Sequence, residues 1–291
     1  MIPAPFIVGT GRCGTTLLRL MLDAHPLVAI PPETHFIPQV ISARRRHLRP
    51  RRAFLKAVTG APFWLDNRMD VEELKRRIWA LRPFRVGDAL RAFYGLYAEG
   101  RGKPRWGDKT PNYVLHMRAI QEVLPEARFI HLIRDGRDVA LSIKDLWFGP
   151  ATFEEAAQRW VSWIEEARRQ ATSLNAYLEV RYEDLVLRPE ETLRKVCDLL
   201  ELPWDEAMLD YHLKAEERLE EMVQPMRLSA GRVIEAAERK AIHTLTGQPP
   251  RQDRIKVWQT EMPAAEQERF ERIAGPLLSE LGYETRESGS L

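Results

Sequence analysis

The feature that most constrains the fold is an apolar strand that runs into a glycine-rich turn and then a helix near the start of the chain. Phe6–Val8 is a short apolar run bounded by proline and glycine, which is typical of a buried strand. Thr15–Ala24 then carries leucine and methionine at helical spacing. His25 ends this pattern, because a residue that precedes proline avoids the helical conformation. Strand, turn and helix in this order predict the start of an α/β fold.

The same alternation of strands and helices continues along the chain. The apolar run Phe129–Ile133 is typical of a second buried strand, and a helix that carries Val139, Leu141 and Ile143 follows it. We also predict helices over Tyr113–Val123 and Thr152–Ser173, a strand over Tyr177–Val180 and a loop over Arg105–Pro111. This order predicts a P-loop-like parallel sheet with helices on both faces and with the functional loops at the carboxyl ends of the strands.

Residues 39–102 interrupt this alternation with a stretch that is rich in arginine and helical in period. We predict a helical insertion here, and we expect it to lie over the acceptor side of the site. The chain has 291 residues, of which 44% are apolar, so it can bury a large core without disulfides or a structural metal. We therefore predict a single domain over residues 1–291.

The charge and the cysteine content narrow the classes of partner and location. The chain has 44 basic and 42 acidic residues, and a net charge of +2 gives no general field, so no nucleic-acid partner is expected. No uninterrupted apolar run reaches about 18 residues, and the first residues lack the pattern of a signal peptide, so we expect neither a transmembrane segment nor export. The two cysteines, Cys13 and Cys197, suggest neither a disulfide framework nor a zinc site. A cytoplasmic location is expected.

The segment Gly9–Thr16 has the properties of an anion-binding loop. It lies between a strand and a helix N-terminus, where converging N–H groups and the helix dipole attract negative charge. Its glycine spacing matches the P-loop pattern, but Thr15 stands where that pattern requires lysine. The strand that could have supplied a metal-binding aspartate is followed by Arg134 instead. We therefore expect a ligand with two anionic groups, bound by fixed cations without a metal ion.

A nucleotide with phosphates at two separate places, bound without a divalent metal, suggests 3'-phosphoadenosine 5'-phosphosulfate. The sulfuryl group that this donor transfers carries less charge than a terminal phosphoryl group. Arginine, lysine and backbone donors can therefore suffice to stabilise the transition state.

These residues resemble the sulfotransferase family, and most closely the branch that contains protein-tyrosine sulfotransferases and bacterial relatives. The resemblance spans most of the chain except residues 39–102. Glu33 occupies the position of the catalytic glutamate of that branch, and Lys109 falls where the branch has a lysine beside the bridging oxygen of the leaving group. The run that resembles the family's 5'-phosphosulfate loop, with cysteine in place of serine, is Arg12, Cys13, Gly14, Thr15 and Thr16.

The resemblance also implies residues for the rest of the nucleotide. Arg134 and Ser142 match the segment that binds the 3'-phosphate, and Tyr182 matches a tyrosine that contributes to nucleotide binding. A basic segment near residues 254–258 resembles one that folds over the nucleotide, and Arg254 or Lys256 would supply its cation.

The mechanism that these roles imply is an in-line displacement at sulfur. Glu33 would remove the proton of the acceptor hydroxyl, while Lys109 and Arg12 would neutralise the charge that develops on the departing nucleotide. His35 is a second candidate for the base. The acceptor could be a small molecule, a sugar, a lipid or a peptide, and the sequence does not indicate the oligomeric state.

Two other functions fit parts of the sequence. A divergent P-loop phosphotransferase would require magnesium and ATP. A non-catalytic module with a nucleotide-binding fold would bind anionic partners through the basic run Arg44–Arg52.

Several residues that could carry chemistry are interpreted as structural. His116 and His131 are expected to be structural histidines, and Cys13 to be a small loop residue rather than a nucleophile. Trp160 and Trp163 stand at helical spacing and are interpreted as core or partner-face residues.

Overall fold

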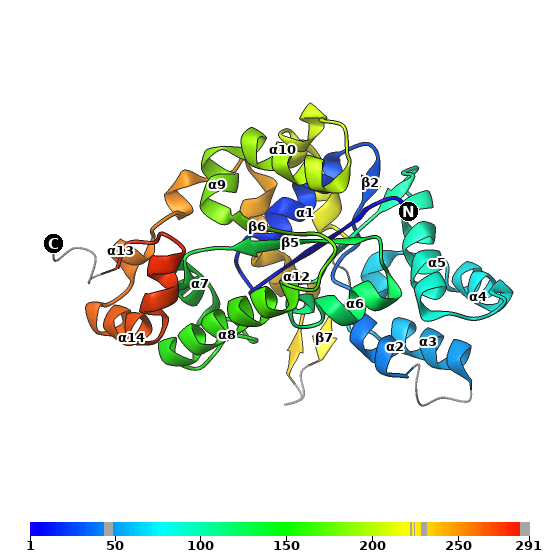
Figure 1. The fold of residues 1–291 in the computed structure, drawn as a ribbon, viewed down its shortest axis with the longest axis horizontal. Coiled ribbons are helices and arrows are strands. Elements are labelled where there is room, and N and C mark those ends of the chain that lie inside the picture. The colour runs from blue at the N-terminus through cyan, green and yellow to red at the C-terminus, as the bar shows by residue number, and fades with distance from the viewer. Residues whose placement is uncertain (44–48, 222, 224, 228–231, 286–291) are drawn as a thin grey trace.

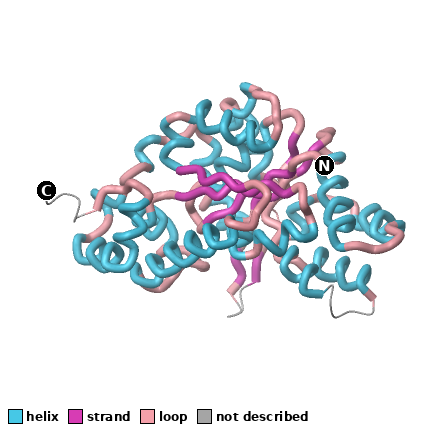
Figure 2. The backbone as a smooth tube through the Cα atoms, in the orientation of Figure 1, coloured by secondary structure: helices cyan, strands magenta, loops and turns pink. Residues whose placement is uncertain are grey.

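The protein is built around a four-stranded sheet in the order β4, β1, β5, β6, in which all neighbouring strands are parallel. The computed structural model describes residues 1–43, 49–221, 223, 225–227 and 232–285. The strands are β1 Ala4–Gly9, β4 Asp108–Lys109, β5 Ala127–Ile133 and β6 Tyr177–Arg181. Helices cover both faces of the sheet (Figure 1, Figure 2). The predicted α/β fold is confirmed.

Side chains of β1 and β5 alternate between two hydrophobic cores. Phe6 and Phe129 face one core, whereas Ile7 and Ile130 face the other. The first core includes the helices α5 (Val86–Glu99) and α6 (Met117–Val123), and the second includes α1 (Thr15–Ala24), α9 (Tyr182–Leu187) and α10 (Pro189–Leu200). Burial on both faces is the reason why these strands are continuous apolar runs in the sequence.

Three predicted helices form close to their expected bounds. They are α1 Thr15–Ala24, α7 Gly136–Ile143 and α8 Phe153–Ala171. The side chain of Asp135 caps α7 by accepting from the N–H of Arg137 at 3.0 Å. Thr152 caps α8 in the same way through the N–H of Glu155 at 3.1 Å.

The loop that the sequence predicted over Arg105–Pro111 contains two short strands. Strand β3 (Arg105–Trp106) pairs in parallel with β2 (Val28–Ala29), and β4 forms the edge of the main sheet. In β4, Lys109 lies opposite Ile7 of β1. Two residues are too few to show an alternating pattern, so the sequence gives no strand signal here. Pairing with β1 is what brings Lys109 to the edge where the anion-binding loop begins.

The helix predicted over Tyr113–Val123 is interrupted. A 3₁₀ helix, η2, covers Pro111–Leu115, and α6 begins only at Met117. His116 separates them and donates its backbone N–H to the carbonyl of Tyr113 at 2.8 Å. Proline at the start of the segment favours a tight turn, and apolar spacing alone does not distinguish such a turn from an α-helix.

The insertion is helical, as predicted, and belongs to the main body of the protein. Its helices are α2 Ile37–Ala43, α3 Pro50–Thr59, η1 Trp64–Asn67, α4 Val71–Ala80 and α5. Phe93 and Tyr94 of α5 pack in the same core as Phe6 of the central strand. The insertion therefore contributes to the large core, and the single domain over residues 1–291 stays a prediction.

The C-terminal part of the chain consists of short elements and one long helix, α14. These are η3 Glu206–Met208, η4 Tyr211–Lys214, α11 Ala215–Leu219, the antiparallel pair β7 Met226–Arg227 and β8 Val233–Ile234, α12 Ala236–Ala241, η5 Thr244–Gly247, η6 Gln252–Arg254, α13 Trp258–Glu261 and α14 Ala264–Glu280. Helix α14 packs on α8, where Trp160 and Phe270 are buried together. Trp160 is therefore a core residue, as interpreted from the sequence.

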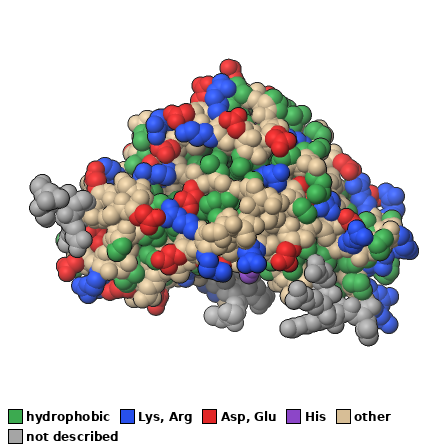
Figure 3. Space-filling view, in the orientation of Figure 1, with side chains coloured by type: hydrophobic (Ala, Val, Ile, Leu, Met, Phe, Trp, Pro, Cys, Tyr) green, Lys and Arg blue, Asp and Glu red, His purple; other side chains and the backbone are tan. Residues whose placement is uncertain are grey.

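The distribution of surface charge and the state of the cysteines can both be compared with the sequence analysis. Basic and acidic side chains are interspersed over the face in Figure 3. Cys13 and Cys197 are both buried and unbonded to each other, and the expected cytoplasmic location stays a prediction. No helix within the described ranges has the length and apolarity to cross a membrane.

His131 on β5 is a buried histidine that should make the fold sensitive to acid. Its Nδ1 lies 2.6 Å from the hydroxyl of Tyr177, which donates its own proton to Glu179. Because the Tyr177 proton goes to Glu179, Nδ1 of the imidazole is the donor to the Tyr177 oxygen. Burial lowers the pKa of His131 from 6.5 to about 4. Between these two pKa values the unfolded chain binds more protons than the folded protein does. The contribution of the neutral ring to folding stability is therefore complete above pH 6.5 and is lost as the pH falls through 4.

We expect the His131→Asn variant to lose less stability in acid than the original protein does. Between pH 7.5 and pH 5 the difference should be about 2 kcal/mol in the free energy of unfolding. Urea unfolding at the two pH values measures it, and other titrating groups cancel in the comparison. An equal loss in both proteins would contradict a neutral, buried His131.

Candidate active site

A cavity of about 480 Å³ lies where the sequence analysis places the functional loops, beyond the carboxyl ends of the central strands. It is lined by segments that are far apart in the chain. Of the residues named from the sequence, it gathers Arg12, Gly14, Thr15, Thr16, Glu33, His35, Lys109, Arg134, Ser142, Tyr182 and Arg254. Most of the predicted site is thus brought together in one place.

The loop between β1 and α1 presents its backbone and Arg12 to this cavity. Gly14 precedes the helix with a φ of 100°, and a Cβ at this position would lie 2.5 Å from the ring of Tyr182. Only glycine meets both requirements. Arg12 also has a left-handed backbone, with a φ of 69°, and its Nε donates to the hydroxyl of Ser142 at 3.1 Å. A strained arginine at a helix N-terminus suits an anion-binding site.

Arg134 contacts several of the segments that line the cavity. Its guanidinium lies 4.6 Å from the ring of Tyr182 and donates to the carbonyl oxygens of Arg12 at 3.3 Å and Arg254 at 2.7 Å. The carboxylate of Asp138 accepts from the backbone N–H groups of residues 256 and 258 at 3.0 and 2.9 Å. Helix α7 thereby fixes the C-terminal basic segment against the cavity.

The guanidinium groups of Arg12, Arg134 and Arg254 all line the cavity. Within the described ranges, Arg134 forms an ion pair with Asp138 at 3.7 Å. Burial, followed by the positive charges of Arg134 and Arg254, lowers the pKa of Arg12. Cations that repel one another in a buried space are stabilised by an anionic ligand. The arrangement is therefore suited to binding a group with several negative charges.

Lys109 and Glu33 form a close ion pair beside these arginines. The Nζ of Lys109 lies 2.5 Å from Oε1 of Glu33, and Nε2 of His35 lies 2.9 Å from Oε2. Burial disfavours the charged carboxylate, but the charge of Lys109 and the hydrogen bond from His35 outweigh it and hold the pKa of Glu33 well below its usual range. Burial lowers the pKa of Lys109, whereas Glu33 acts in the opposite direction. Glu33 is therefore an ionised carboxylate that can accept a proton.

A buried hydrogen-bond network behind this pair sets its position. The hydroxyl of Thr34 donates to Asp108 at 2.8 Å, and Tyr94 donates to the same carboxylate oxygen at 2.8 Å. Thr34 and Asp108 are the chain neighbours of Glu33 and Lys109, so their bond joins the two segments that carry the ion pair. His35 has a φ of 54°, and this turn directs its ring back to Glu33.

Two residues predicted to bind the nucleotide do not present their side chains to the cavity. Cys13 is buried in the core, and burial raises the pKa of its thiol to about 12, which keeps it protonated. The Nζ of Lys256 lies 2.7 Å from Glu284, outside the cavity. Between the two cations considered for the C-terminal segment, Arg254 is the one that lines the cavity. The reason is local: a φ of 59° at Lys256 turns the chain at this residue.

Several lining residues were not identified from the sequence. They include Arg19, Trp147, Phe148, Arg159, Tyr211, Arg239 and His243. Trp163, which was interpreted as a core or partner-face residue, also lines the cavity. The insertion contributes Phe63, so residues 211–254 provide more of the cover than the insertion that was expected to lie over this side. These short elements have no periodic pattern that would indicate their position.

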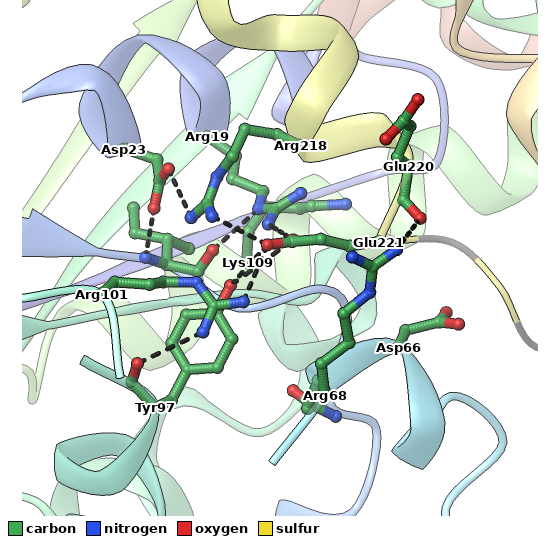
Figure 4. A network of polar contacts seen from close by, with 12 residues as sticks. Arg19, Asp23, Asp66, Arg68, Tyr97, Arg101, Lys109, Arg218, Glu220 and Glu221 are labelled. Carbon is green, nitrogen blue, oxygen red and sulfur yellow. Dashed lines mark hydrogen bonds and ion pairs between the residues drawn. The ribbon is translucent and has the colours of Figure 1, made fainter. Parts of the chain in front are cut away.

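The cover is attached to α1 through a buried charge network (Figure 4). Glu221 accepts from Arg19 at 3.0 Å, from Arg101 at 2.8 Å and from Arg218 at 2.8 Å. Arg218 also forms an ion pair with Asp23 of α1 at 2.6 Å. Because breaking a buried pair leaves an uncompensated charge, this network fixes the cover relative to the anion-binding helix.

The described residues contain no group of three or more histidine, cysteine, aspartate or glutamate side chains that could hold a metal ion. Metal independence stays a prediction. The run Arg44–Arg52 falls partly outside the described residues, since these omit 44–48.

Comparison with known proteins agrees with this geometry. A model of the Sulfotransferase family matches residues 3–206. Protein-tyrosine sulfotransferase of Drosophila melanogaster is 28% identical over 247 residues, which cover 79% of this chain and 46% of that protein. Nodulation protein NoeE of Sinorhizobium fredii is 28% identical over 303 residues, which cover 96% of this chain and 65% of that protein. The chain thus spans less than two thirds of the length of these curated relatives.

A solved structure shares the fold. The sulfotransferase domain of the olefin synthase from Synechococcus PCC 7002 has a TM-score of 0.62 and 23% sequence identity, over 97% of this chain and 95% of that one. The resemblance that the motifs indicated is confirmed at the level of family and fold.

Proposed function

The chain belongs to the sulfotransferase family, and from this premise we propose that it transfers a sulfuryl group from 3'-phosphoadenosine 5'-phosphosulfate to an acceptor hydroxyl. The observation that carries the proposal is the meeting of Arg12, Arg134 and Arg254 in one cavity beside the Lys109–Glu33 pair. The three arginines fit a donor with several negative charges. The Lys109–Glu33 pair offers a base and a cation for the transfer itself.

The donor would be held at both of its anionic ends. The loop residues Arg12, Gly14, Thr15 and Thr16 would bind the 5'-phosphosulfate with their backbone donors and side chains. Arg134, Ser142 and Arg254 would bind the 3'-phosphate, and Tyr182 would contact the nucleotide.

The transfer would be an in-line displacement. The acceptor oxygen attacks sulfur while the bond from sulfur to the bridging oxygen breaks, and the leaving group is 3'-phosphoadenosine 5'-phosphate, or PAP. Glu33 takes the proton of the acceptor hydroxyl. Lys109 and Arg12 stabilise the negative charge that develops on the leaving group. In this assignment His35 orients Glu33 through their hydrogen bond.

The acceptor that relatives support first is a tyrosyl hydroxyl of a protein or peptide, because several are named protein-tyrosine sulfotransferases. The cavity offers the aromatic side chains of Phe63, Trp147, Phe148 and Trp163, which could pack against a phenol ring. Tyrosine peptides should be compared with sugar and lipid hydroxyls by measuring PAP release. Equal rates with all of them would contradict a preference for phenols.

Calorimetry with PAP and ATP, each titrated once with a chelator and once with magnesium, tests the donor. We expect PAP to bind and ATP to bind weakly. Binding of ATP that requires magnesium would favour a phosphotransferase instead. Salt-sensitive binding of anionic polymers, without PAP binding or sulfuryl transfer, would favour a module that acts through Arg44–Arg52.

Arg134→Ala should weaken PAP binding about 10- to 100-fold, because hydrogen bonds to a charged group contribute about 1.5 to 3 kcal/mol. Arg128→Ala is the matched control, since Arg128 lies in β5, the strand that Arg134 follows, and does not line the cavity. Calorimetry with PAP measures both. Unchanged affinity in Arg134→Ala, or equal loss in the control, would remove Arg134 from the donor site.

A further inference from the structure

His243 is a titratable residue of the cavity that the proposed mechanism does not use. It lies between α12 and η5 and lines the cavity together with Arg12, Glu33 and Lys109. Its backbone is fixed, because its N–H donates to the carbonyl of Lys240 at 2.9 Å and its own carbonyl accepts from Thr246 at 3.0 Å. Its imidazole forms no hydrogen bond with the described part of the chain. Both ring nitrogens are therefore available to a ligand.

The charges that act most strongly on His243 come from four segments of the chain, and Arg134, Arg239, Arg251 and Arg254 line the same cavity. Lys109 on β4, Arg12 in the anion-binding loop and Arg19 on α1 act against a protonated ring, and Glu33 acts in its favour. Burial is the largest effect, and together these effects lower the pKa of His243 to about 3. Without a ligand the imidazole is neutral at physiological pH.

A bound donor would reverse this balance. PAP carries two phosphate groups, whose negative charges would offset those of Arg12 and Lys109 and would attract a proton to the ring. Opposite charges at contact distance favour the protonated form of an imidazole. The ring would then offer two N–H donors to oxyanions in place of one.

We propose that His243 belongs to the donor site and that its imidazole takes up a proton from solvent when PAP or the sulfuryl donor binds. The protonated ring then acts as a further cation toward the bound oxyanions, and the proton returns to solvent when the nucleotide leaves. This inference rests on the proposed function, because it requires that the cavity bind this nucleotide.

Calorimetry of PAP binding tests the proposal through the number of protons taken up. The titrations are run at pH 7 in buffers that differ in ionisation enthalpy, since the heat observed varies with that enthalpy in proportion to proton uptake. We expect the original protein to take up about one proton more than His243→Gln does. Protonation changes of PAP itself cancel in this difference. His116→Gln is the matched control, because His116 does not line the cavity, and it should behave as the original protein does.

The affinities provide a second readout. His243→Gln should bind PAP about 10-fold more weakly than the original protein at pH 6.5, and the difference should disappear above pH 9. If His243→Gln does not fold, histidine NMR spectra of the original protein should still show one imidazole that becomes protonated on addition of PAP at pH 7.

The outcomes separate the inference from the function on which it rests. PAP binding with equal proton uptake in the original protein and His243→Gln would overturn the inference and leave the proposed function intact. Absence of PAP binding in the original protein would overturn both. Proton uptake that persists in His243→Gln but is lost in His116→Gln would also overturn the assignment to His243.

Discussion

Replacing Glu33 with glutamine should lower the turnover number by about 10²- to 10⁴-fold, which is the usual contribution of a general base. Glutamine has the same shape and can still accept a hydrogen bond from Lys109, but it cannot accept a proton at neutral pH. PAP binding should be retained or become tighter, because the change removes a negative charge from a cavity lined by arginines. Steady-state rates with saturating donor, together with calorimetry, measure the two effects.

His35 and an exposed glutamate provide the comparison for this variant. His35→Ala should reduce turnover less than Glu33→Gln, because His35 only hydrogen-bonds the carboxylate that takes the proton. Glu191→Gln should leave turnover unchanged, since Glu191 lies on the outer surface of α10 and does not line the cavity. A larger loss in His35→Ala than in Glu33→Gln would make His35 the base.

The sequence was sufficient to place the two arginines of the proposed donor site near each other. Arg12 and Arg134 each follow a buried strand, and the carboxyl ends of parallel strands lie at one edge of a sheet. Both residues could therefore be placed near each other before the structure was known. The glycine pattern also predicted the tight turn of the loop, because the backbone conformation at Gly14 excludes other residues.

Other parts of the site depend on contacts that have no local signal. Lys109 was assigned only by resemblance, because a two-residue strand such as β4 is specified by its pairing with β1. His243 and Trp163 could not be placed, since tertiary packing rather than periodicity brings their segments to the cavity. Lys256 shows the converse: its position in a basic motif suggested a ligand, but the backbone turn directs it to Glu284.

Replacing Lys109 with alanine should reduce turnover about 10²- to 10³-fold, as the loss of one preorganised donor to a developing charge does. The reduction should be similar for every acceptor, because Lys109 acts on the leaving group that all of them share. Lys109→Met, which keeps more of the buried volume, distinguishes the loss of charge from the loss of packing. Lys144→Ala is the control, since Lys144 is exposed and lies outside the cavity.

The same variant should change how activity depends on pH. In the original protein Lys109 holds the pKa of Glu33 below its usual range, so Glu33 stays ionised as the pH falls toward 4.5. Without Lys109, burial raises the pKa of Glu33 against fewer opposing groups, among them His35 and Arg12. The base is then protonated at higher pH, and the acidic limb of kcat/KM should move upward in Lys109→Met but not in Lys144→Ala. An acidic limb that stays in place would contradict an effect of Lys109 on the pKa of Glu33. A loss of turnover confined to one acceptor would indicate that Lys109 acts on the acceptor rather than on the leaving group.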